Sequence, residues 1–409
     1  MGRFIIIVLD GFGVGQMPDV EACRSQDIGS STAESILSAV PELSLPSLEG
    51  LGLMNILGHD SKNMRRVPNA VYGKAMLAHA GADTFFGHQE IAGTRPAGHV
   101  ESSIAPKMDA IRDLLEAEGY AVETYQGSEG RRLLIVDRAL TVADNVECDP
   151  GQAYNVTAAI DDIDFEKVMR VGRLVRSVSQ VPRVICFGGR GVHIGDILGA
   201  IEEHENGFIG VNAPKSGVYR EDYHCVHLGC GVDPENQIPT ILGRMGIPSL
   251  LLGKAADIVQ NPYGISQSIV DTDEVLLKTL ELVREYKDAF IFANVQQTDL
   301  AGHRENARLY AQILMRADEG VARIEKELGG EDVMIVMADH GNDPLIGHPH
   351  HTREMVPLMI YSKRARPGCI GIRRTMSDVA ATAAEYFRSA PPENGSSMLG
   401  LLTGGRQKA

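Results

Sequence analysis

Residues 4–15 read FIIIVLDGFGVG, an unbroken apolar run that ends at Asp10 and is followed by glycines. A short run rich in β-branched residues is typical of a buried strand in a parallel sheet. Asp10 would then lie at the carboxyl end of that strand, where α/β proteins bind their ligands. The glycines allow the backbone to turn sharply and to approach a ligand closely. An Asp-Gly pair after a strand is also an ordinary turn, so this stretch alone leaves both interpretations open.

Further apolar runs of the same kind lie along the chain, and helical patterns separate them. These runs, which we expect to be buried strands of the same parallel sheet, are 249–252, 289–295, 333–337 and 356–361. Residues 304–328 repeat apolar side chains along one helical face and end at two glycines. Ser377 is placed to cap a second helix over 378–387. This alternation predicts an α/β fold with a doubly wound, mostly parallel sheet.

The middle of the chain follows a different pattern, in which helices and strands are more closely mixed. The predicted elements are helices at 108–118 and 165–178 and strands at 121–125, 133–136 and 181–187. We therefore expect an inserted α+β cap domain over residues 100–221, above the carboxyl edge of the main sheet. The metal-binding core would then consist of residues 1–99 and 222–409.

The composition is that of an ordinary globular protein. The chain has 409 residues, of which 44% are hydrophobic and 23% charged, and its formal net charge is −15. An acidic chain is a poor candidate for binding nucleic acid or an anionic membrane, and no apolar run is long enough to span a bilayer. The six cysteines form no CxxC pair. We therefore expect free thiols and, since no secretory start is visible, a cytoplasmic protein.

Side chains that bind metals follow three separate predicted strands. Asp339 and His340 come after the strand at 333–337, close to a histidine-rich run at 348–351. Asp299 and His303 follow another strand and, being four residues apart, lie on one side of a helical turn. Carboxylate and imidazole together bind divalent ions such as zinc, manganese and iron. Because strand ends meet at one edge of a sheet, we expect a metal site there. The candidate ligands are Asp10, Asp299, His303, Asp339, His340 and His351.

Thr84 is the candidate nucleophile, within the stretch GADTFFGHQE at 81–90. Alone, a threonine in such a loop is typical of a helix N-cap. Beside a metal site it gains a second interpretation, because a metal ion lowers the pKa of a bound hydroxyl and favours its attack on phosphorus.

These motifs together resemble the phosphopentomutases of the alkaline phosphatase superfamily, with kinship to the cofactor-independent phosphoglycerate mutases. The matching stretches are VLDGFGVG, GADTFFGHQEIAGT, TDLAGH, MADHGNDP and HHTREMVPLMIY. The resemblance implies an alkaline-phosphatase-like core with two divalent metal ions, typically manganese, while zinc and iron remain candidates. It further implies two ligand sets, which are Asp10, Thr84, Asp339 and His340 for one ion and Asp299, His303 and His351 for the other.

The resemblance also implies an activity. Such enzymes are isomerases that move a phosphoryl group within a small sugar phosphate, through a phosphothreonine (here Thr84) and a bisphosphate intermediate. A sugar bisphosphate is then a candidate activator. Two alternatives stay open at this stage. The superfamily's core also serves phosphatases and phosphodiesterases, and the chain can instead be a non-catalytic binding protein that metal stabilises.

The cap region departs from the family pattern. The family's A-R-P-F motif corresponds to RVICFGGRG, which has Phe187 near the arginine position, and its N-R-H-D-Y motif corresponds to APKSGVYREDYHC. Gln89 replaces the tryptophan of G-H-W-E, and Asp299 lies four residues before His303 where the family has five, a position held here by Thr298. Candidates for binding substrate phosphate in this region are Arg183, Arg190, Lys215 and Arg220.

We therefore hypothesise that the metal chemistry is kept while substrate recognition has changed. Conversion of ribose 1-phosphate to ribose 5-phosphate at an ordinary enzymatic rate, roughly 1–1000 per second, would disprove the change.

Overall fold

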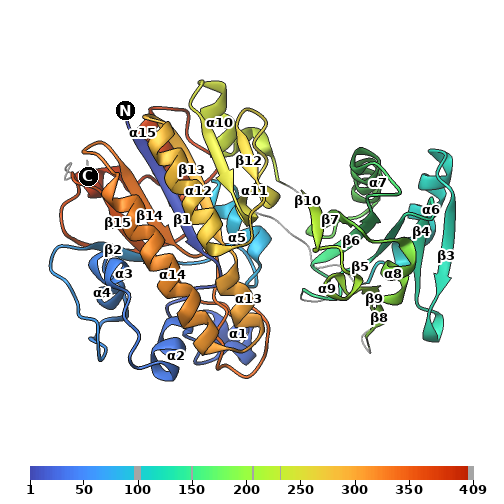
Figure 1. Cartoon of the computed structure of the whole chain (residues 1–409), viewed down its shortest axis with the longest axis horizontal. Helices are drawn as coiled ribbons and strands as arrows, with labels where there is room; N and C mark the ends of the chain where they lie inside the picture. The colour runs from blue at the N-terminus through green and yellow to red at the C-terminus, as the bar shows by residue number, and fades with distance from the viewer. Residues whose placement is uncertain (96–102, 149–150, 205–206, 231, 404–409) are drawn as a thin grey trace. The chain divides into compact units, whose positions relative to one another are not determined.

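The computed structural model describes residues 1–95, 103–148, 151–204, 207–230 and 232–403, and the chain divides into two compact units. Unit 1 comprises Met1–Pro96 and Asp233–Ala409, and unit 2 comprises Ala97–Val232 (Figure 1). The predicted boundary at 99/100 lies outside the described residues. The predicted boundary at 221/222 differs from this division, because Glu221–Gly229 is a strand of the unit 2 sheet.

Unit 1 is built on an eight-stranded sheet. In spatial order its strands are β12 (Ile265–Gln267), β11 (Ser249–Leu252), β13 (Ala289–Val295), β1 (Arg3–Leu9), β14 (Val333–Met337), β15 (Val356–Tyr361), β2 (Val71–Ala75) and β16 (Gly368–Arg373). The strands from β12 to β14 pair in parallel, so their carboxyl ends meet at one edge. Strands β1, β13 and β14 are almost wholly buried, as their continuous apolar sequences predict.

Strand β15 corrects the prediction that residues 356–361 form a parallel strand. It pairs antiparallel with β14 on one side and with β2 on the other. Residues 338–355, which connect β14 to β15, contain no helix. A parallel pair needs a long crossover connection, and without one the chain turns back from the edge at which β14 ends. The sheet is therefore mostly parallel in one half and mixed in the other.

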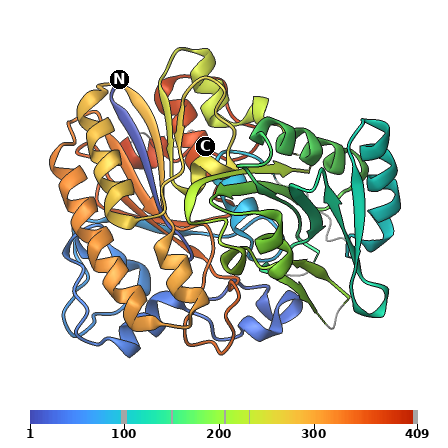
Figure 2. The same ribbon diagram turned by 45° about the vertical axis from the view of Figure 1, so that its right-hand side comes forward.

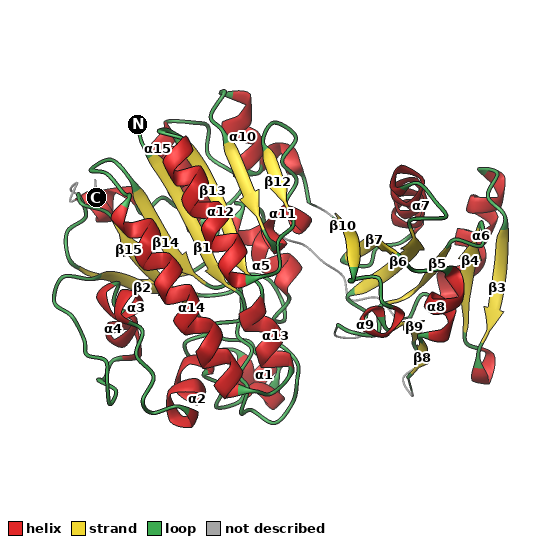
Figure 3. Ribbon diagram, viewed as in Figure 1, coloured by secondary structure: helices red, strands yellow, loops and turns green. Residues whose placement is uncertain are grey.

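Helices lie on both faces of this sheet, with α12 and α14 in front of the strands and α15 behind them (Figure 3). The helices of unit 1 are α1 (Val20–Cys23), α2 (Thr32–Ala39), α3 (Pro46–Gly50), α4 (Leu53–Leu57), α5 (Thr84–Ile91), α10 (Ile238–Arg244), α11 (Lys254–Ile258), α12 (Thr272–Glu285), α13 (Gln297–His303), α14 (Ala307–Lys326), α15 (Asp378–Phe387) and α16 (Leu399–Thr403). The predicted helices at 304–328 and 378–387 correspond to α14 and α15. Ser377 does not cap α15 with its side chain, because its hydroxyl donates to the carbonyl oxygens of Glu90 and Thr94.

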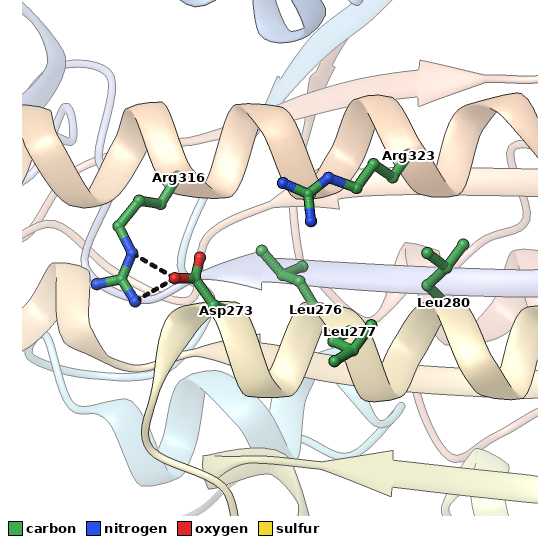
Figure 4. Close-up of a pocket in the computed structure, with 7 residues that line it drawn as sticks. Asp273, Leu276, Leu277, Leu280, Arg316 and Arg323 are labelled. Atoms are coloured by element: carbon green, nitrogen blue, oxygen red, sulfur yellow. Dashed lines mark hydrogen bonds and ion pairs between the residues drawn. The ribbon is translucent and has the colours of Figure 1, made fainter.

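Helices α12 and α14 pack closely along their length. A Cβ atom at Gly320 would lie 2.5 Å from Leu276, so glycine is what permits this approach. Arg316 binds the carboxylate of Asp273 at 2.7 Å beside a small surface pocket between the two helices (Figure 4). Helices α12 and α14 therefore form one outer layer over the parallel half of the sheet.

Unit 2 is an α+β unit with its own core, and Figure 2 turns its sheet toward the viewer. The six-stranded sheet has the order β10 (Glu221–Gly229), β7 (Arg183–Arg190), β6 (Ala153–Ala159), β5 (Leu140–Asp144), β4 (Arg132–Val136) and β3 (Val122–Gln126), and β8 (Ile201–Glu203) pairs with β9 (Ile209–Val211). Its helices are α6 (Met108–Ala117), α7 (Phe165–Val178), α8 (Ile194–Gly199) and α9 (Ala213–Ser216). The predicted helices and strands correspond to α6, α7, β3, β4 and β7, while the remaining strands were not predicted.

Within the ranges given above, every helix is too short or too polar to cross a bilayer. The six cysteines, all within the described ranges, form no disulfide, as their spacing predicts.

Candidate metal centre and nucleophile

Three adjacent parallel strands deliver the centre. Asp10 directly follows β1, and Asp339 and His340 follow its neighbour β14 after one residue. Asp299 lies on α13, which begins two residues after β13 on the other side of β1. Because these strands end at the same edge, side chains that are far apart in the sequence come together there.

The first group of ligand atoms comes from Asp10, Asp339 and His340, which lie within 4.8 Å of one another. All three side chains are fully buried. His340 Nε2 lies 3.2 Å from Asp339 Oδ2 and 3.5 Å from Asp10 Oδ1. Among the residues that the structure describes, neither His340 Nε2 nor Asp10 Oδ1 has a hydrogen-bond partner. Buried polar atoms without partners are costly, so this group suits a cation that binds them.

The second group comes from Asp299, His340 and His351, whose ligand atoms also lie within 4.8 Å of one another. His303 is next to this group, with Nε2 3.4 Å from Asp299 Oδ2 and 3.1 Å from His351 Nε2. The geometry differs from the two sets that the resemblance implies in one respect, because His340 borders both groups. Thr84 and His303 lie beside these groups, and the assignment of residues to two ions stays a prediction.

The tautomers of the three histidines can be assigned from their partners. Each imidazole donates from Nδ1 to a backbone carbonyl: His303 to Pro349 at 2.6 Å, His340 to Gly341 at 3.0 Å and His351 to Ala82 at 2.8 Å. In the neutral ring Nε2 then carries a lone pair, and these lone pairs face one another and the carboxylates. Metal-binding histidines have this arrangement, in which the far nitrogen is held by a backbone oxygen. The donor set therefore fits divalent metal ions.

Thr84 lies beside the first group. Helix α5 begins at Thr84 because the Asp83 carboxylate caps it, accepting from the backbone N–H of Phe86 at 3.2 Å. The Thr84 hydroxyl donates to Asp339 Oδ2 at 2.7 Å. A Cβ atom at Gly87 would lie only 2.7 Å from the Asp339 carbonyl oxygen, so α5 packs directly on the residue that the hydroxyl binds. This close packing sets the position of the hydroxyl.

Lys254 is a residue of the centre that the sequence analysis missed. Its ammonium lies 2.7 Å from Asp10 Oδ2 and 3.1 Å from Asp299 Oδ2. Burial works to lower the pKa of Lys254, but the carboxylates of Asp10, Asp299 and Asp339 raise it above its ordinary value. A signal existed, because Gly253 and Lys254 directly follow the predicted strand at 249–252. A charged residue that follows a fourth parallel strand lies at the same ligand-binding edge as the residues that follow the other three strands.

The charged groups of the centre shift one another's pKa. Burial favours the protonated form of Asp299, but Lys254 and His303 hold its pKa well below the usual range. Burial acts on Asp339 in the same way, and His340 keeps the pKa of that carboxyl low. In return, burial works to lower the pKa of His340, but Asp339, Asp10 and Asp299 together raise it well above its ordinary value. Protons and metal ions therefore compete for the same imidazole nitrogen.

Two asparagines and a threonine orient the ligands. Asn342 donates from Nδ2 to Asp299 Oδ1 at 2.8 Å, and Asn294 donates to Asp10 Oδ2 at 3.0 Å. The Thr298 hydroxyl donates to the Asp10 carbonyl oxygen at 2.7 Å, so it binds the backbone of Asp10 and is not one of the candidate metal ligands. Single residues of these types follow no pattern in a sequence, and only the fold reveals their partners.

The candidate phosphate-binding residues of unit 2 are not gathered at one point. Arg183 and Arg190 stand at opposite ends of β7, seven residues and roughly 23 Å apart. The Arg190 guanidinium binds Asp161 at 3.1 Å and Asp222 at 2.7 Å. One phosphate group therefore cannot contact both arginines.

Lys215 and Arg220 differ in their partners. The Lys215 ammonium is paired with Glu202. Arg220 is exposed, and its guanidinium makes no ion pair with the residues that the structure describes. Of the candidates with exposed side chains, Arg220 thus has the charge that is least engaged within unit 2.

This chain is similar to known proteins over most of its length. The model of the Metalloenzyme superfamily matches residues 2–391. The phosphopentomutase of Desulfitobacterium hafniense is 32% identical over 416 residues, which cover 98% of this chain and 100% of that protein. The phosphopentomutase of Caldanaerobacter subterraneus is 32% identical over 421 residues, or 97% of each. Among solved structures, a phosphoglycerate mutase of Leishmania mexicana covers 97% of each chain at 13% identity, with a TM-score of 0.47.

Proposed function

This chain belongs to the metalloenzyme superfamily and, within it, to the phosphopentomutase family, so it is a metal-dependent phosphomutase; on that premise we propose that it moves a phosphoryl group within a small sugar phosphate by way of Thr84. Phosphorylated Thr84 gives its phosphoryl group to the free hydroxyl of the sugar phosphate, which yields a bisphosphate. The enzyme then takes back the other phosphoryl group. A sugar bisphosphate would accordingly prime an enzyme that lacks phosphate.

The observation that carries this proposal is the placement of the Thr84 hydroxyl. It lies 2.7 Å from Asp339 Oδ2, beside a buried group in which Asp10 Oδ1 and His340 Nε2 find no hydrogen-bond partner in the described part of the chain. It also stands at the first residue of α5, where helix N–H groups favour a negatively charged phosphoryl group. A surface threonine would have neither feature.

We propose that Asp10, Thr84, Asp339 and His340 hold one divalent ion and that Asp299, His303 and His351 hold the other. Two ions bound by these residues would supply positive charge that neutralises the transferring phosphoryl group. A set of carboxylates and imidazoles suits manganese, and zinc and iron are compatible with it. The histidine tautomers described above present Nε2 for this purpose.

Lys254 supplies a fixed positive charge at the same place. Its ammonium contacts both Asp10 and Asp299, so it lies between the two ligand groups. The transition state of phosphoryl transfer spreads negative charge over the equatorial oxygens, and a lysine within reach stabilises that charge. We infer that Lys254 binds the transferring phosphoryl group once metal ions have taken over the carboxylates.

We propose that unit 2 recognises the substrate and that Arg220 is its leading candidate for binding the second phosphate. Arg220→Ala should then raise KM for the sugar phosphate about tenfold to a hundredfold, the loss of one charge-assisted hydrogen bond. Arg190→Ala is the matched control, because Arg190 already binds Asp161 and Asp222. Equal effects of the two substitutions would remove Arg220 from this role.

The direct test is mass spectrometry of manganese-loaded enzyme treated with a sugar bisphosphate. We expect one phosphate on Thr84; if this phosphate carries an isotopic label, addition of unlabelled sugar phosphate should move the label to the sugar while unlabelled phosphate replaces it on Thr84. Thr84→Ser should keep the transfer, and Thr84→Val should abolish it. Release of free phosphate to water, without transfer to the sugar, would instead identify a phosphatase. A screen of sugar phosphates beginning with ribose 1-phosphate then defines the substrate.

A further inference from the structure

His88 is a buried histidine, and its hydrogen-bond partners indicate its role. It lies on α5 four residues after Thr84, so the two side chains share one face of the helix. Its side chain is fully buried and stacks on Phe292, with ring centroids 5.9 Å apart. Nothing in the roles assigned so far uses it.

The neighbour on the far side of the ring is Asn294, and its orientation follows from Asp10. The Asn294 amide group faces Asp10 Oδ2 at 3.0 Å, and a carboxylate oxygen can only accept. That amide atom is therefore the nitrogen. The same nitrogen lies 2.7 Å from His88 Nε2, so its second hydrogen points to the ring. His88 Nε2 accepts this hydrogen bond and carries no proton.

The near side of the ring gives the same answer independently. His88 Nδ1 lies 2.9 Å from the Thr84 carbonyl oxygen and 3.2 Å from Asp339 Oδ2, and both of these oxygens only accept. Nδ1 therefore carries the proton. The same Nδ1 lies 3.4 Å from the Thr84 hydroxyl oxygen. The ring is thus held as one tautomer, whose Nδ1–H donates to the Thr84 carbonyl and lies within reach of Thr84 Oγ1, the atom that would bear the phosphoryl group.

We propose that His88 is a further catalytic residue and Asn294 its positioning residue, an inference that rests on Thr84 being the phosphoryl carrier. When the bond between phosphorus and Thr84 Oγ1 breaks, its electron pair stays on Oγ1 and phosphorus bonds to the substrate hydroxyl oxygen. The hydroxyl proton ends on Oγ1 and restores threonine. Throughout the step the His88 proton stays on Nδ1 and donates a hydrogen bond to Oγ1, which stabilises the charge that develops there.

This role is electrostatic and confined to the transition state. Before the bond breaks, the N–H has the Thr84 carbonyl and Asp339 as acceptors, and Oγ1 is at the long end of hydrogen-bond distance. As negative charge grows on Oγ1, the hydrogen bond to it strengthens. Loss of a preorganised donor of this kind costs about 10²–10³-fold in kcat and leaves KM unchanged.

Two substitutions distinguish the roles of the two ring nitrogens. His88→Asn places an amide nitrogen near the position of Nδ1 and keeps the donor, whereas His88→Gln places polar atoms near Nε2 and loses it. We expect His88→Asn to transfer phosphate from Thr84 within about tenfold of the wild-type rate, and His88→Gln to be slower by roughly 10²–10³-fold with KM unchanged. Equal losses in both variants, or a loss that appears in KM, would overturn the inference.

A spectroscopic measurement covers the case in which the variants fold poorly. Histidine-selective 15N NMR of the wild-type enzyme loaded with diamagnetic zinc should show His88 protonated at Nδ1 and unprotonated at Nε2. Asn294→Asp should move the ring to a form protonated at Nε2, because a carboxylate only accepts. A wild-type ring protonated at Nε2 contradicts the inference. Failure of Thr84 to be phosphorylated in the wild type would instead contradict the proposed function.

Discussion

The contact between α5 and Asp339 makes Gly87→Ala the most informative substitution in the core. The packing around Gly87 leaves no room for a side chain, because an added Cβ would lie 2.7 Å from the Asp339 carbonyl oxygen and 2.9 Å from the Asp339 Cβ. Ordinary van der Waals contact begins at 3.4 Å, so helix and strand end must separate by 0.7 Å. This separation acts directly on Thr84 and on the oxygen that its hydroxyl binds.

The size of the effect follows from that displacement. A misplacement of about 1 Å in a reacting group costs roughly a hundredfold in rate, so 0.7 Å should slow transfer from Thr84 about tenfold to a hundredfold. Overpacking of this kind costs about 1–3 kcal/mol of stability, and alanine returns at most about 1 kcal/mol through its higher helix propensity. We expect a modest loss in the free energy of unfolding beside a large loss in rate.

The assay is single-turnover transfer of labelled phosphate from Thr84 to the sugar phosphate, with urea unfolding measured in parallel. Gly50→Ala is the matched control, since Gly50 lies in helix α3 and an added Cβ would meet nothing within 4 Å. The control should keep the wild-type rate and be as stable as the wild type or up to about 1 kcal/mol more stable. If Gly87→Ala transferred phosphate as fast as Gly50→Ala, the reasoning that α5 positions Thr84 against Asp339 would be refuted.

Three further predictions concern the charges of the centre. Lys254→Met should lower kcat by roughly ten- to a hundredfold while metal analysis still finds two ions per chain; an unchanged kcat would remove Lys254 from phosphoryl binding. The carboxylates of Asp339, Asp10 and Asp299 together raise the pKa of His340 despite its burial, so below this pKa a proton occupies the nitrogen that a metal ion needs. Apparent manganese affinity should therefore rise with pH and level off above it, with proton release measured by titration in buffers of different ionisation enthalpy; a flat profile would contradict the competition. Removal of metal by a chelator should lower the free energy of unfolding by about 3 kcal/mol for each ion lost, relative to enzyme saturated at a hundred times Kd, and an equal melting temperature in both states would argue against binding at this centre.

The strands of the core were predictable because each is a short apolar run with a clear end. The runs ending near Asp10, Asp339 and Asp299 carried both the fold and the candidate ligands, since a buried parallel strand places its last residue at the ligand-binding edge. The direction of β15 was not predictable from its own residues. An apolar run looks the same in both directions, and the deciding feature is the missing crossover between 337 and 356.

The supporting residues of the site escaped the sequence for a different reason. Lys254 and Asn294 act through partners that are remote in the chain, and His88, although four residues after Thr84, also depends on Asn294 and Asp339. Unit 2 was harder still, because strands β5 and β6 carry polar residues such as Thr141, Asn155 and Thr157 and lack the simple alternation of a half-buried strand. The role of its basic residues likewise depends on which of them are already paired, as Arg190 is and Arg220 is not.

The most direct test of the central claim is an anomalous-scattering map at the manganese edge from crystals of the metal-loaded enzyme. We predict two peaks, one bounded by Asp10, Thr84, Asp339 and His340 and the other by Asp299, His303 and His351. The Lys254 ammonium should no longer contact both Asp10 and Asp299. A single peak, or peaks away from these residues with Lys254 still bound to both carboxylates, would contradict the two-metal centre.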